Sequence, residues 1–538
     1  MKTTRYSFMI ALVATGLTLS GQTSAVWSPD NGDGTYTNPI IHADYSDPDI
    51  CRSGDDFYMT SSSFNSVPGL PILHSTDLVN WEIINYAVPS FPGSYYDTPQ
   101  HGNGVWAPCL RYHEGTFYIY WGDPDRGIYM VKTQDPAGEW SVPVLVKKAY
   151  GNIDPSPLWD DDGKVYMVHA FAHSRAGIKS TLQVVELTPE GDEILDKGVI
   201  VFDGHANHET IEGPKFYKRN GYYYIFAPAG GVPTGWQLIL RSRDVYGPYE
   251  EKIVLAQGNT DINGPHQGGM VELDNGETWF VHFQDKEAYG RVVHLEPVKW
   301  IDNWPVMGRD PDGDGTGEPV ITYQKPGLPK SKTTNPVETD EFNEPNLGLQ
   351  WQWNANPQPG WYDLKSNNGF LRLNAKSAPD QATNLWMQPN LILQKFPAPA
   401  FRNTVKLDAF NLKAGEETGL IIFGRDYASL VVKKSTKGYY LEQRVSSNAD
   451  KNLPEAVNKS MSLTSPTVYL RSETREGGMT TFHYSLDGQK FTKIGKEFVA
   501  REGKWVGAKS GLYALKDKET GTSGYALYDW FTVDNLAK

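Results

Sequence analysis

The chain has 538 residues, more than one ordinary hydrophobic core accommodates, so we expect two domains. Its 52 glycines and 30 tyrosines, with charged residues at only 21%, are typical of a folded, loop-rich, mostly β protein and exclude a disordered chain. The net charge of −14 argues against nucleic acid or an anionic membrane as a partner and favours a neutral ligand.

Residues 1–25 have the pattern of an export signal. Lys2 and Arg5 form a positive start, an apolar run covers residues 8–19, and a small-residue cleavage site ends at Ala25. The apolar run is too short to form a stable membrane span. We therefore expect a secreted or periplasmic mature chain that has no membrane attachment once the signal is removed.

A unit of roughly 50 residues then recurs five times between residues 26 and 324. Each unit opens on a short polar turn, and an apolar aromatic strand follows about ten residues later. The turns contain Asp47, Ala107, Asp154, Glu212 and His266, and the aromatic strands contain residues 57–59, 117–120, 165–167, 222–225 and 279–281. Five such repeats predict a five-bladed β-propeller of antiparallel strands over residues 26–324.

Four of the turn residues are titratable. In a propeller, the innermost strand of every blade lines one central channel, so equivalent positions that are far apart in the sequence converge. We therefore expect Asp47, Asp154, Glu212 and His266 to meet at the mouth of this channel. Carboxylates at close range repel one another, and folding does not require them. The arrangement indicates a functional site.

The chain changes character after the fifth unit. Residues 325–337, rich in Pro, Lys and Thr, are a linker by composition. Over residues 338–538, short alternating strands are separated by turn signals, for example at residues 403–407 and 480–485. This pattern, which lacks a helical period, predicts a β-sandwich. The whole chain is thus predicted to be all-β, with no helix of useful length in either domain.

Two further features leave alternatives open. Cys51 and Cys109 follow the turns of the first two repeats, and they either form a disulfide between neighbouring blades or stay as two buried free thiols. Their spacing is not that of a metal site. Residues 310–318 resemble the first half of a calcium-binding loop, but Ile321 stands where the twelfth-position acid is needed. A glycine-rich surface loop is the alternative there.

The carboxyl groups fit one kind of chemistry. Hydrolysis of a glycosidic bond takes two carboxyl groups on opposite sides of a sugar: one protonates the leaving oxygen, and the other attacks or activates water. Asp47 and Glu212 lie in the first and fourth units and can face each other across the channel. Glu212, with the longer side chain, suits the leaving oxygen if a nearby anion raises its pKa. Asp154 is the candidate for that anion.

The sequence resembles glycoside hydrolase family 43. The residues that carry the resemblance are Asp47-Pro48, Ile153-Asp154-Pro155-Ser156-Pro157, Glu212-Gly213-Pro214 and, in the tail, Leu349-Gln350-Trp351-Gln352-Trp353. The tail resembles the concanavalin-like, jelly-roll sandwich of the family's β-xylosidase and α-L-arabinofuranosidase branch. The resemblance implies an inverting mechanism with Asp47 as the general base, Glu212 as the general acid, and Asp154 as the residue that tunes and orients the acid.

The same resemblance assigns further residues. His266 matches a channel histidine that holds a water molecule or a metal ion, which allows a structural calcium ion in the channel, although no cofactor is required. Arg291 matches an arginine that contacts the terminal sugar and the catalytic carboxylates. Trp106 and Phe64 are placed where aromatic rings wall the pocket and stack on the apolar face of a sugar.

Together these implications predict an exported, exo-acting glycosidase. It would remove terminal α-L-arabinofuranosyl or β-D-xylosyl residues from hemicellulose or pectin side chains or from oligosaccharides. Residues 61–69 resemble the branch that acts on arabinofuranose, and a β-xylosidase is the alternative. Exo action is favoured if the sandwich reaches over the channel.

Two other function classes fit the sequence less well. A sugar-binding propeller without activity would not need an acid, a base and a tuning anion together. A retaining propeller glycosidase that acts on fructans has an Arg before its middle acid and a Cys after its Glu. Here Ile153 precedes Asp154, and Gly213 follows Glu212.

Overall fold

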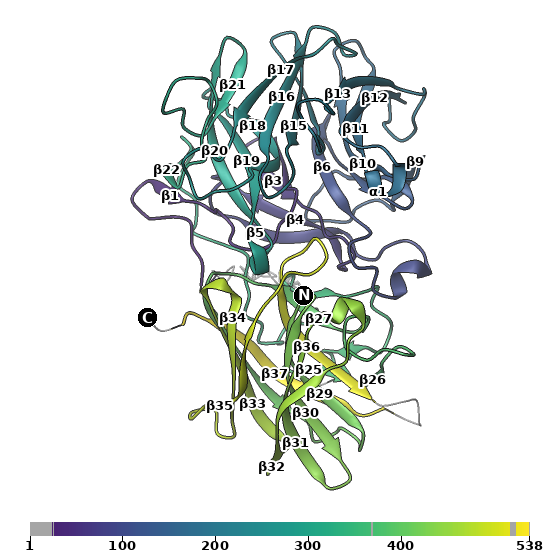
Figure 1. Ribbon diagram of the computed structural model, residues 1–538, viewed down its shortest axis with the longest axis vertical. Helices are drawn as coiled ribbons and strands as arrows, with labels where there is room; N and C mark the ends of the chain where they lie inside the picture. The colour runs from purple at the N-terminus through teal and green to yellow at the C-terminus, as the bar shows by residue number, and fades with distance from the viewer. Residues whose placement is uncertain (1–23, 25, 367–368, 517–522, 537–538) are drawn as a thin grey trace, which may run out of the picture.

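The structure, a computed structural model, describes residues 24, 26–366, 369–516 and 523–536. It confirms the predicted fold class: a five-bladed β-propeller is followed by a β-sandwich, and the two lie one above the other (Figure 1). The predicted export signal lies almost entirely outside the described residues. Within the described part of the chain, no helix has the length and apolar character that a membrane crossing requires.

The propeller consists of five antiparallel sheets of four strands, each a simple meander. Blade one contains β2 (Asp49–Ser53), β3 (Asp56–Thr60), β4 (Gly69–Ser75) and β5 (Glu82–Val88). Blade two contains β6 (Trp106–His113), β7 (Thr116–Asp123), β8 (Gly127–Thr133) and β9 (Val144–Lys148). Blade three contains β10 (Asn152–Trp159), β11 (Val165–Phe171), β12 (Thr181–Leu187) and β13 (Val199–Asp203). Blade four contains β14 (Lys215–Arg219), β15 (Tyr222–Ala229), β16 (Trp236–Ser242) and β17 (Glu250–Leu255). Blade five contains β18 (His266–Glu272), β19 (Thr278–Asp285), β20 (Arg291–Ile301) and β21 (Trp304–Met307).

The aromatic strands predicted from the sequence are the second strands of the blades, and they fill the space between blades. Tyr120 of β7 and Met167 of β11 are both fully buried in the apolar layer between blades two and three. Phe226 of β15 and Phe280 of β19 have ring centroids 6.3 Å apart between blades four and five. Because both faces of each blade are covered in this way, the inner strands hold fixed positions around the channel.

The inner strands are entered through residues of left-handed backbone conformation. One residue at each entry has φ between 35° and 58°: Asp47, Ala107, Asp154, Gly213 and Gln267. These five are the structurally equivalent positions, so the equivalence predicted from the sequence is off by one residue in blades four and five. In blades four and five, Glu212 and His266 stand one residue before the position at which the backbone conformation repeats.

The ring is closed by the N-terminal segment, which joins the last blade. Strand β1 (Thr35–Thr37) pairs with β22 (Thr322–Gln324), and Ile41 pairs with Val293 of β20. Arg52 of blade one and Asp274 of blade five form a bidentate ion pair at 2.7 Å. Blades one and five therefore meet as tightly as the other neighbours do.

The sandwich has two antiparallel sheets around one apolar core. The first sheet contains β23 (Gln352–Trp353), β27 (Ile392–Lys395), β36 (Lys509–Lys516), β29 (Glu416–Phe423), β30 (Tyr427–Ser435), β31 (Gly438–Ser446) and β32 (Ala456–Leu463), and β26 (Lys376–Ser377) joins it in parallel beside β36. The second contains β24 (Tyr362–Asp363), β25 (Leu371–Asn374), β37 (Tyr525–Asp534), β28 (Phe401–Asp408), β33 (Thr467–Arg475), β34 (Met479–Ser485) and β35 (Thr492–Val499).

The described helices are short, as predicted. One turn of α-helix, α1 (His173–Ala176), and four 3₁₀ turns are present in the described residues: η1 (Ser94–Asp97), η2 (Glu287–Tyr289), η3 (Ala449–Lys451) and η4 (Glu476–Gly478). Both cysteines are buried free thiols, so the structure favours the second of the two alternatives for this pair.

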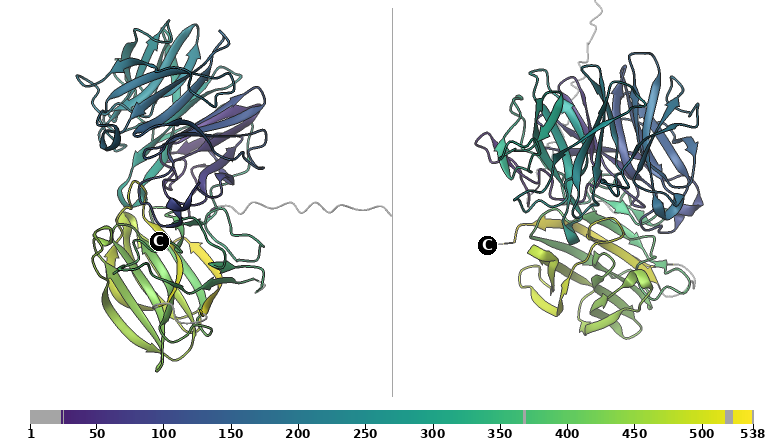
Figure 2. Two further views of the ribbon diagram at one scale, coloured as in Figure 1. Left: turned by 90° about the vertical axis from the view of Figure 1, so that its right-hand side faces the viewer. Right: turned by 45° about the horizontal axis from the view of Figure 1, so that its top comes forward.

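The two domains are in extensive contact, as the views of Figure 2 show. The Trp353 N–H donates to the Val67 carbonyl at 2.6 Å, and the Ala508 N–H donates to the Ala288 carbonyl at 2.7 Å. The His101 ring stacks on Trp386 with centroids 3.7 Å apart. Backbone-to-backbone bonds between domains fix their relative position more closely than side-chain contacts alone would.

Candidate active site

A cavity of about 300 Å³ lies where the inner strands of the propeller meet. A volume of this order is the lower end of the range for small-molecule sites. All seven site residues predicted from the sequence line it, and the wall also includes residues that the prediction missed. The lining residues are Asp47, Phe64, Trp106, Ala107, Ile153, Asp154, Glu212, Val232, Pro233, His266, Gln267, Arg291 and Trp505.

Asp47 is buried and held by hydroxyl donors. Ser46 Oγ and Ser62 Oγ donate to Asp47 Oδ2 at 2.7 and 2.5 Å. Arg291 Nη1 lies 3.7 Å from the other oxygen, Oδ1, and donates to Ser46 Oγ at 2.6 Å. Hydroxyl and guanidinium donors stabilise the ionised form of a carboxyl group, which is the form that a base requires.

Asp154 is tied to the segment that carries Glu212. The Gly213 N–H donates to Asp154 Oδ2 at 2.8 Å. Burial raises the pKa of Asp154, and the Gly213 N–H opposes this rise. Since Gly213 directly follows Glu212, this bond fixes the backbone from which the Glu212 side chain projects. The predicted orienting contact therefore runs through a backbone amide.

Glu212 differs from the other two acids because its side chain is 34% exposed. Burial of its carboxyl group raises the pKa of Glu212 to about 8, and the negative charges of Asp154 and Asp47 contribute, while Arg291 opposes them. At neutral pH, Glu212 therefore retains its proton. A protonated Glu212 in one cavity with Asp47, a carboxyl group that accepts two hydroxyl hydrogen bonds, is an arrangement that suits acid and base catalysis.

His266 is fully buried beside the acid. Its Nε2 lies 3.6 Å from Glu212 Oε1, and burial, together with the charge of Arg291, lowers the pKa of His266 to about 3. The imidazole is therefore neutral. Neither ring nitrogen, nor Oε1 of Gln267, has a hydrogen-bond partner among the described residues. One imidazole and one amide oxygen are too few ligands to enclose a calcium ion, which takes six to eight, so a calcium ion here would keep most of its water ligands.

Aromatic rings form the walls of the cavity. Phe64 and Trp106 have centroids 6.3 Å apart, and Trp106 lies 6.5 Å from Trp505. The Arg291 guanidinium lies 5.8 Å from the Trp505 ring. Trp505 belongs to the sandwich, so the second domain reaches over the propeller channel and completes the pocket. In the sequence, Trp505 stands between Gly503 and Gly507, about 200 residues beyond the last propeller repeat, and no motif points to it.

Asp44 holds the Trp505 loop to the propeller. Asp44 Oδ1 accepts the Arg291 N–H at 2.9 Å, and Oδ2 accepts the Gly507 N–H at 3.0 Å. A Cβ atom on Gly290 would lie 2.4 Å from Asp44 Oδ1 and 2.6 Å from the Gly507 nitrogen. The two backbones can approach this closely only because both positions are glycine.

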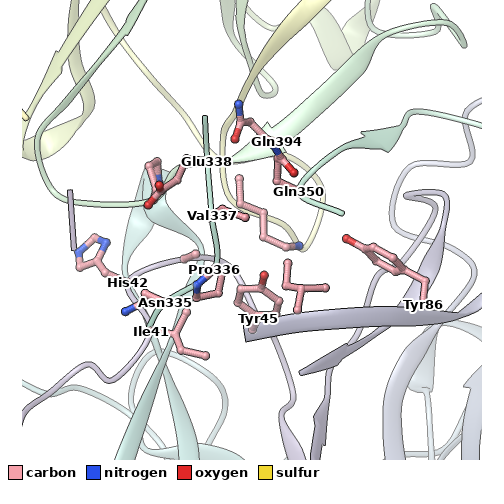
Figure 3. A pocket seen from close by; sticks show the side chains of 14 residues that line it. Ile41, His42, Tyr45, Tyr86, Asn335, Pro336, Val337, Glu338, Gln350 and Gln394 are labelled. Atoms are coloured by element: carbon pink, nitrogen blue, oxygen red, sulfur yellow. The ribbon is translucent and has the colours of Figure 1, made fainter. Parts of the chain in front are cut away.

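A second cavity of about 620 Å³ lies beside the first and shares Val232, Pro233, Arg291 and Trp505 with it. Asp285, Glu287, Arg425 and Glu502 contribute polar groups to its lining. A third cavity at the domain interface, near His42 and Glu338, has only about 30 Å³ and holds no sugar ring (Figure 3). The carboxyl groups of Asp47, Asp154 and Glu212 therefore face one small pocket that continues into a wider space.

Comparisons with known proteins agree with this geometry. The profile described as "Glycosyl hydrolases family 43" matches residues 36–305, and the one described as "Beta xylosidase C-terminal Concanavalin A-like domain" matches residues 339–534. A putative β-xylosidase of Xylanibacter ruminicola is 38% identical over 90% of this chain and 86% of its own length. A non-reducing end α-L-arabinofuranosidase of Bacteroides ovatus is 31% identical over 92% of this chain and 94% of its own.

A comparison with solved structures also finds a protein of family 43. A family 43 protein from Bacillus licheniformis, 27% identical, has a TM-score of 0.81 over 93% of this chain and 100% of its own. A single relationship thus covers both domains. The chain belongs to glycosyl hydrolases family 43 and is a glycoside hydrolase.

Proposed function

We propose that the protein is an exo-acting glycosidase that removes one terminal pentose from an oligosaccharide or polysaccharide. The observation that carries this is the small cavity: about 300 Å³ holds a single sugar ring, and Trp505 of the sandwich closes one side of it. The wider cavity beyond Trp505 suits the rest of the substrate. An enzyme that cleaved chains internally would need an open groove on both sides of the carboxyl groups.

The terminal sugar is an α-L-arabinofuranosyl or a β-D-xylosyl residue. The printed names of the relatives include both activities, which favours neither exclusively. Side chains of plant hemicellulose and pectin carry such sugars, and export of the mature chain, proposed from residues 1–25, would bring the enzyme to them. The charge of −14 favours a neutral carbohydrate over nucleic acid.

The mechanism that we propose is a single displacement with inversion. Glu212 gives its proton to the leaving glycosidic oxygen while Asp47 takes a proton from a water molecule, whose oxygen forms the new bond to the anomeric carbon. Asp154, through Gly213, keeps Glu212 in place and holds its pKa high. Arg291 keeps Asp47 and Ser46 aligned, and Phe64, Trp106 and Trp505 stack on the sugar.

The proposal is tested with nitrophenyl α-L-arabinofuranoside, β-D-xyloside and β-D-galactoside, with NMR detection of the first sugar released. We expect turnover of one or both pentosides, little of the hexoside, and product of inverted anomeric configuration. Release of internal fragments from a polysaccharide, without a free monosaccharide, would contradict exo action. Early product of retained configuration would contradict the roles of Asp47 and Glu212.

A further inference from the structure

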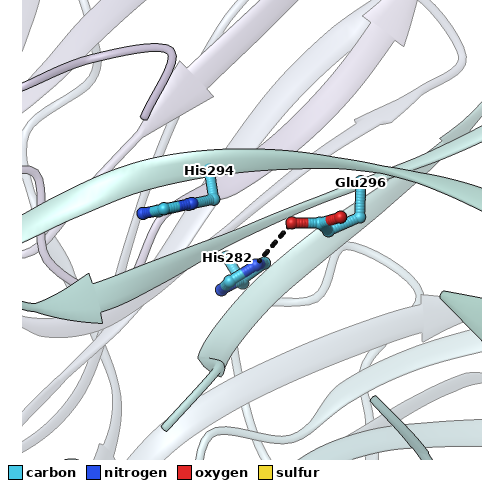
Figure 4. Close-up of side chains that lie close together, drawn as sticks. All are labelled: His282, His294 and Glu296. Carbon is cyan, nitrogen blue, oxygen red and sulfur yellow. Dashed lines mark hydrogen bonds and ion pairs between the residues drawn. The ribbon is translucent and has the colours of Figure 1, made fainter. Parts of the chain in front are cut away.

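The hairpin of β19 and β20 in blade five carries two histidines and a glutamate whose side chains lie close together (Figure 4). His282 and His294 are cross-strand partners, and Glu296 lies two residues further along β20. All three side chains are buried, at 0%, 1% and 0% exposure, and one donor atom from each lies within 4.8 Å of the others. None of the three lines the active-site cavity.

The hydrogen bonds of His282 fix where its lone pair points. Its Nδ1 lies 3.1 Å from the Phe283 carbonyl oxygen, which can only accept, so Nδ1 carries the hydrogen. In the neutral ring, Nε2 then presents a lone pair to Glu296 Oε1 at 3.2 Å. Glu296 Oε2 accepts the Val320 N–H at 2.9 Å. A lone pair that faces a carboxylate oxygen is repelled unless a proton or a cation lies between them.

His294 adds a second, independent indication. Although it is 1% exposed, neither of its nitrogens has a hydrogen-bond partner in the part of the chain that the structure describes. A neutral imidazole has one unprotonated nitrogen, whose lone pair is available to a ligand. An unsatisfied buried polar group destabilises the fold, and a ligand at this nitrogen would offset that cost.

We propose that His282, His294 and Glu296 bind one divalent ion of the zinc class. Two imidazole nitrogens and a carboxylate oxygen are a donor set that Zn²⁺ takes, and imidazole suits zinc far better than calcium. Bonds of about 2.0–2.1 Å to two atoms that are 3.2 Å apart subtend an angle of about 103°, close to tetrahedral. The Nδ1–H of His282 on a backbone carbonyl is the outer contact that orients a metal-binding imidazole.

The ion would act as a structural link rather than in catalysis. It would join β19 to β20, and through Glu296 it would hold Val320, which lies in the segment that leads to β22 and the ring closure. The ion would thus stabilise blade five close to the place where β22 pairs with the N-terminal strand β1. Binding to the folded state alone raises its stability by mass action.

The test measures metal content in the full chain, produced without a polyhistidine tag, loaded with Zn²⁺ and dialysed. We expect about one zinc per chain in the wild type by elemental mass spectrometry, and at least about a tenfold loss in Glu296→Gln and His294→Ala. Glu296→Gln keeps an oxygen that can accept the Val320 N–H, so this variant tests the metal site if His294→Ala fails to fold. His169→Gln, which removes a fully buried histidine of blade three, is the matched control and should retain the zinc.

A second readout identifies the ligands. Co²⁺ in place of zinc should give the visible absorption of a tetrahedral site in the wild type and in His169→Gln, and lose it in Glu296→Gln. Zinc should also raise the unfolding temperature of the wild type but not of Glu296→Gln. A folded wild type that retains no zinc would overturn the proposal, since a proton would then bridge His282 and Glu296. Equal zinc content in all variants would overturn it too, because the ion would lie elsewhere, for example at Asp310, Asp312 and Asp314.

Discussion

Asp47 and Glu212 carry the same functional group in different surroundings. Asp47 is surrounded by two serine hydroxyls and Arg291. Glu212 faces anions and a neutral imidazole, and burial raises its pKa to about 8. Donors stabilise a carboxylate, whereas burial and like charge stabilise a carboxylic acid. The division of roles between base and acid therefore follows from the contacts of each side chain.

This division predicts different substrate dependence for two near-isosteric variants. Glu212→Gln should lose about 10²–10⁴-fold in kcat on a poor leaving group such as a natural oligosaccharide, because general acid catalysis is absent. It should lose far less on a dinitrophenyl glycoside, whose leaving oxygen needs no proton. Asp47→Asn should lose activity on both. Steady-state rates on the two substrates provide the measurement, and equal losses in Glu212→Gln would contradict its role as the acid.

Asp154 is predicted to act through the pKa of Glu212. The rate should fall as pH rises through that pKa, because the acid loses its proton. Asp154 raises the pKa of Glu212, so Asp154→Asn should lower it and move the alkaline limb of kcat/KM to lower pH, by about one pH unit. Asp123→Asn, a buried carboxyl in blade two bonded to Tyr96, should leave the limb in place. An unchanged pH profile in Asp154→Asn would limit this residue to a structural role.

At the residue scale, what could be predicted from the sequence was set by the repeats. Asp47, Asp154, Glu212 and His266 could be found from their places in the repeats, whereas Arg291, Trp106 and Phe64 are found from the resemblance to family 43. Ser62 and Asp44 could not, because an ordinary Ser or Asp has no local signal for a contact that is made across the fold.

At the scale of the element, the entry to each inner strand determines where the site residues lie. A non-glycine residue in the left-handed region is strained, and the strain is typical of functional sites. Asp47 and Asp154 both have this conformation, with φ of 54° and 57°. The aromatic strands were predictable from their pattern, but the one-residue offset of blades four and five was not, because it depends on backbone angles that Gly213 and Gln267 do not reveal in sequence.

The contact between the Gly290 turn and the Trp505 loop yields a further prediction. Gly290→Ala places a Cβ 2.6 Å from the Gly507 nitrogen, so the loop must move and Trp505 with it. We expect kcat/KM to fall at least about tenfold, since small displacements at a site are costly. Gly276→Ala is the control: it also places a side chain at a glycine of positive φ, 85°, but no atom lies within 4 Å of the added Cβ. Activity that survives equally in both variants would argue against the loop as part of the site.

At the scale of the whole molecule, the two domains are expected to unfold together. Direct backbone bonds, as between Trp353 and Val67 and between Ala508 and Ala288, would be lost if either domain opened alone. Calorimetry should therefore show one cooperative transition, and activity should disappear at the same temperature as the near-ultraviolet circular dichroism. Two separate calorimetric peaks would indicate that the domains are independent. The sequence predicted both domains but offered no signal for this coupling, since the contacting segments are far apart.

Because Trp505 belongs to the sandwich, part of the wall of the proposed sugar pocket comes from a domain that contains none of the proposed catalytic carboxyl groups. Exchange of sandwiches between homologues would thus retune which glycosides are accepted while the bond-breaking apparatus stays the same. Recombination at the linker could therefore change the range of substrates, in evolution or by engineering, without substitutions in the propeller.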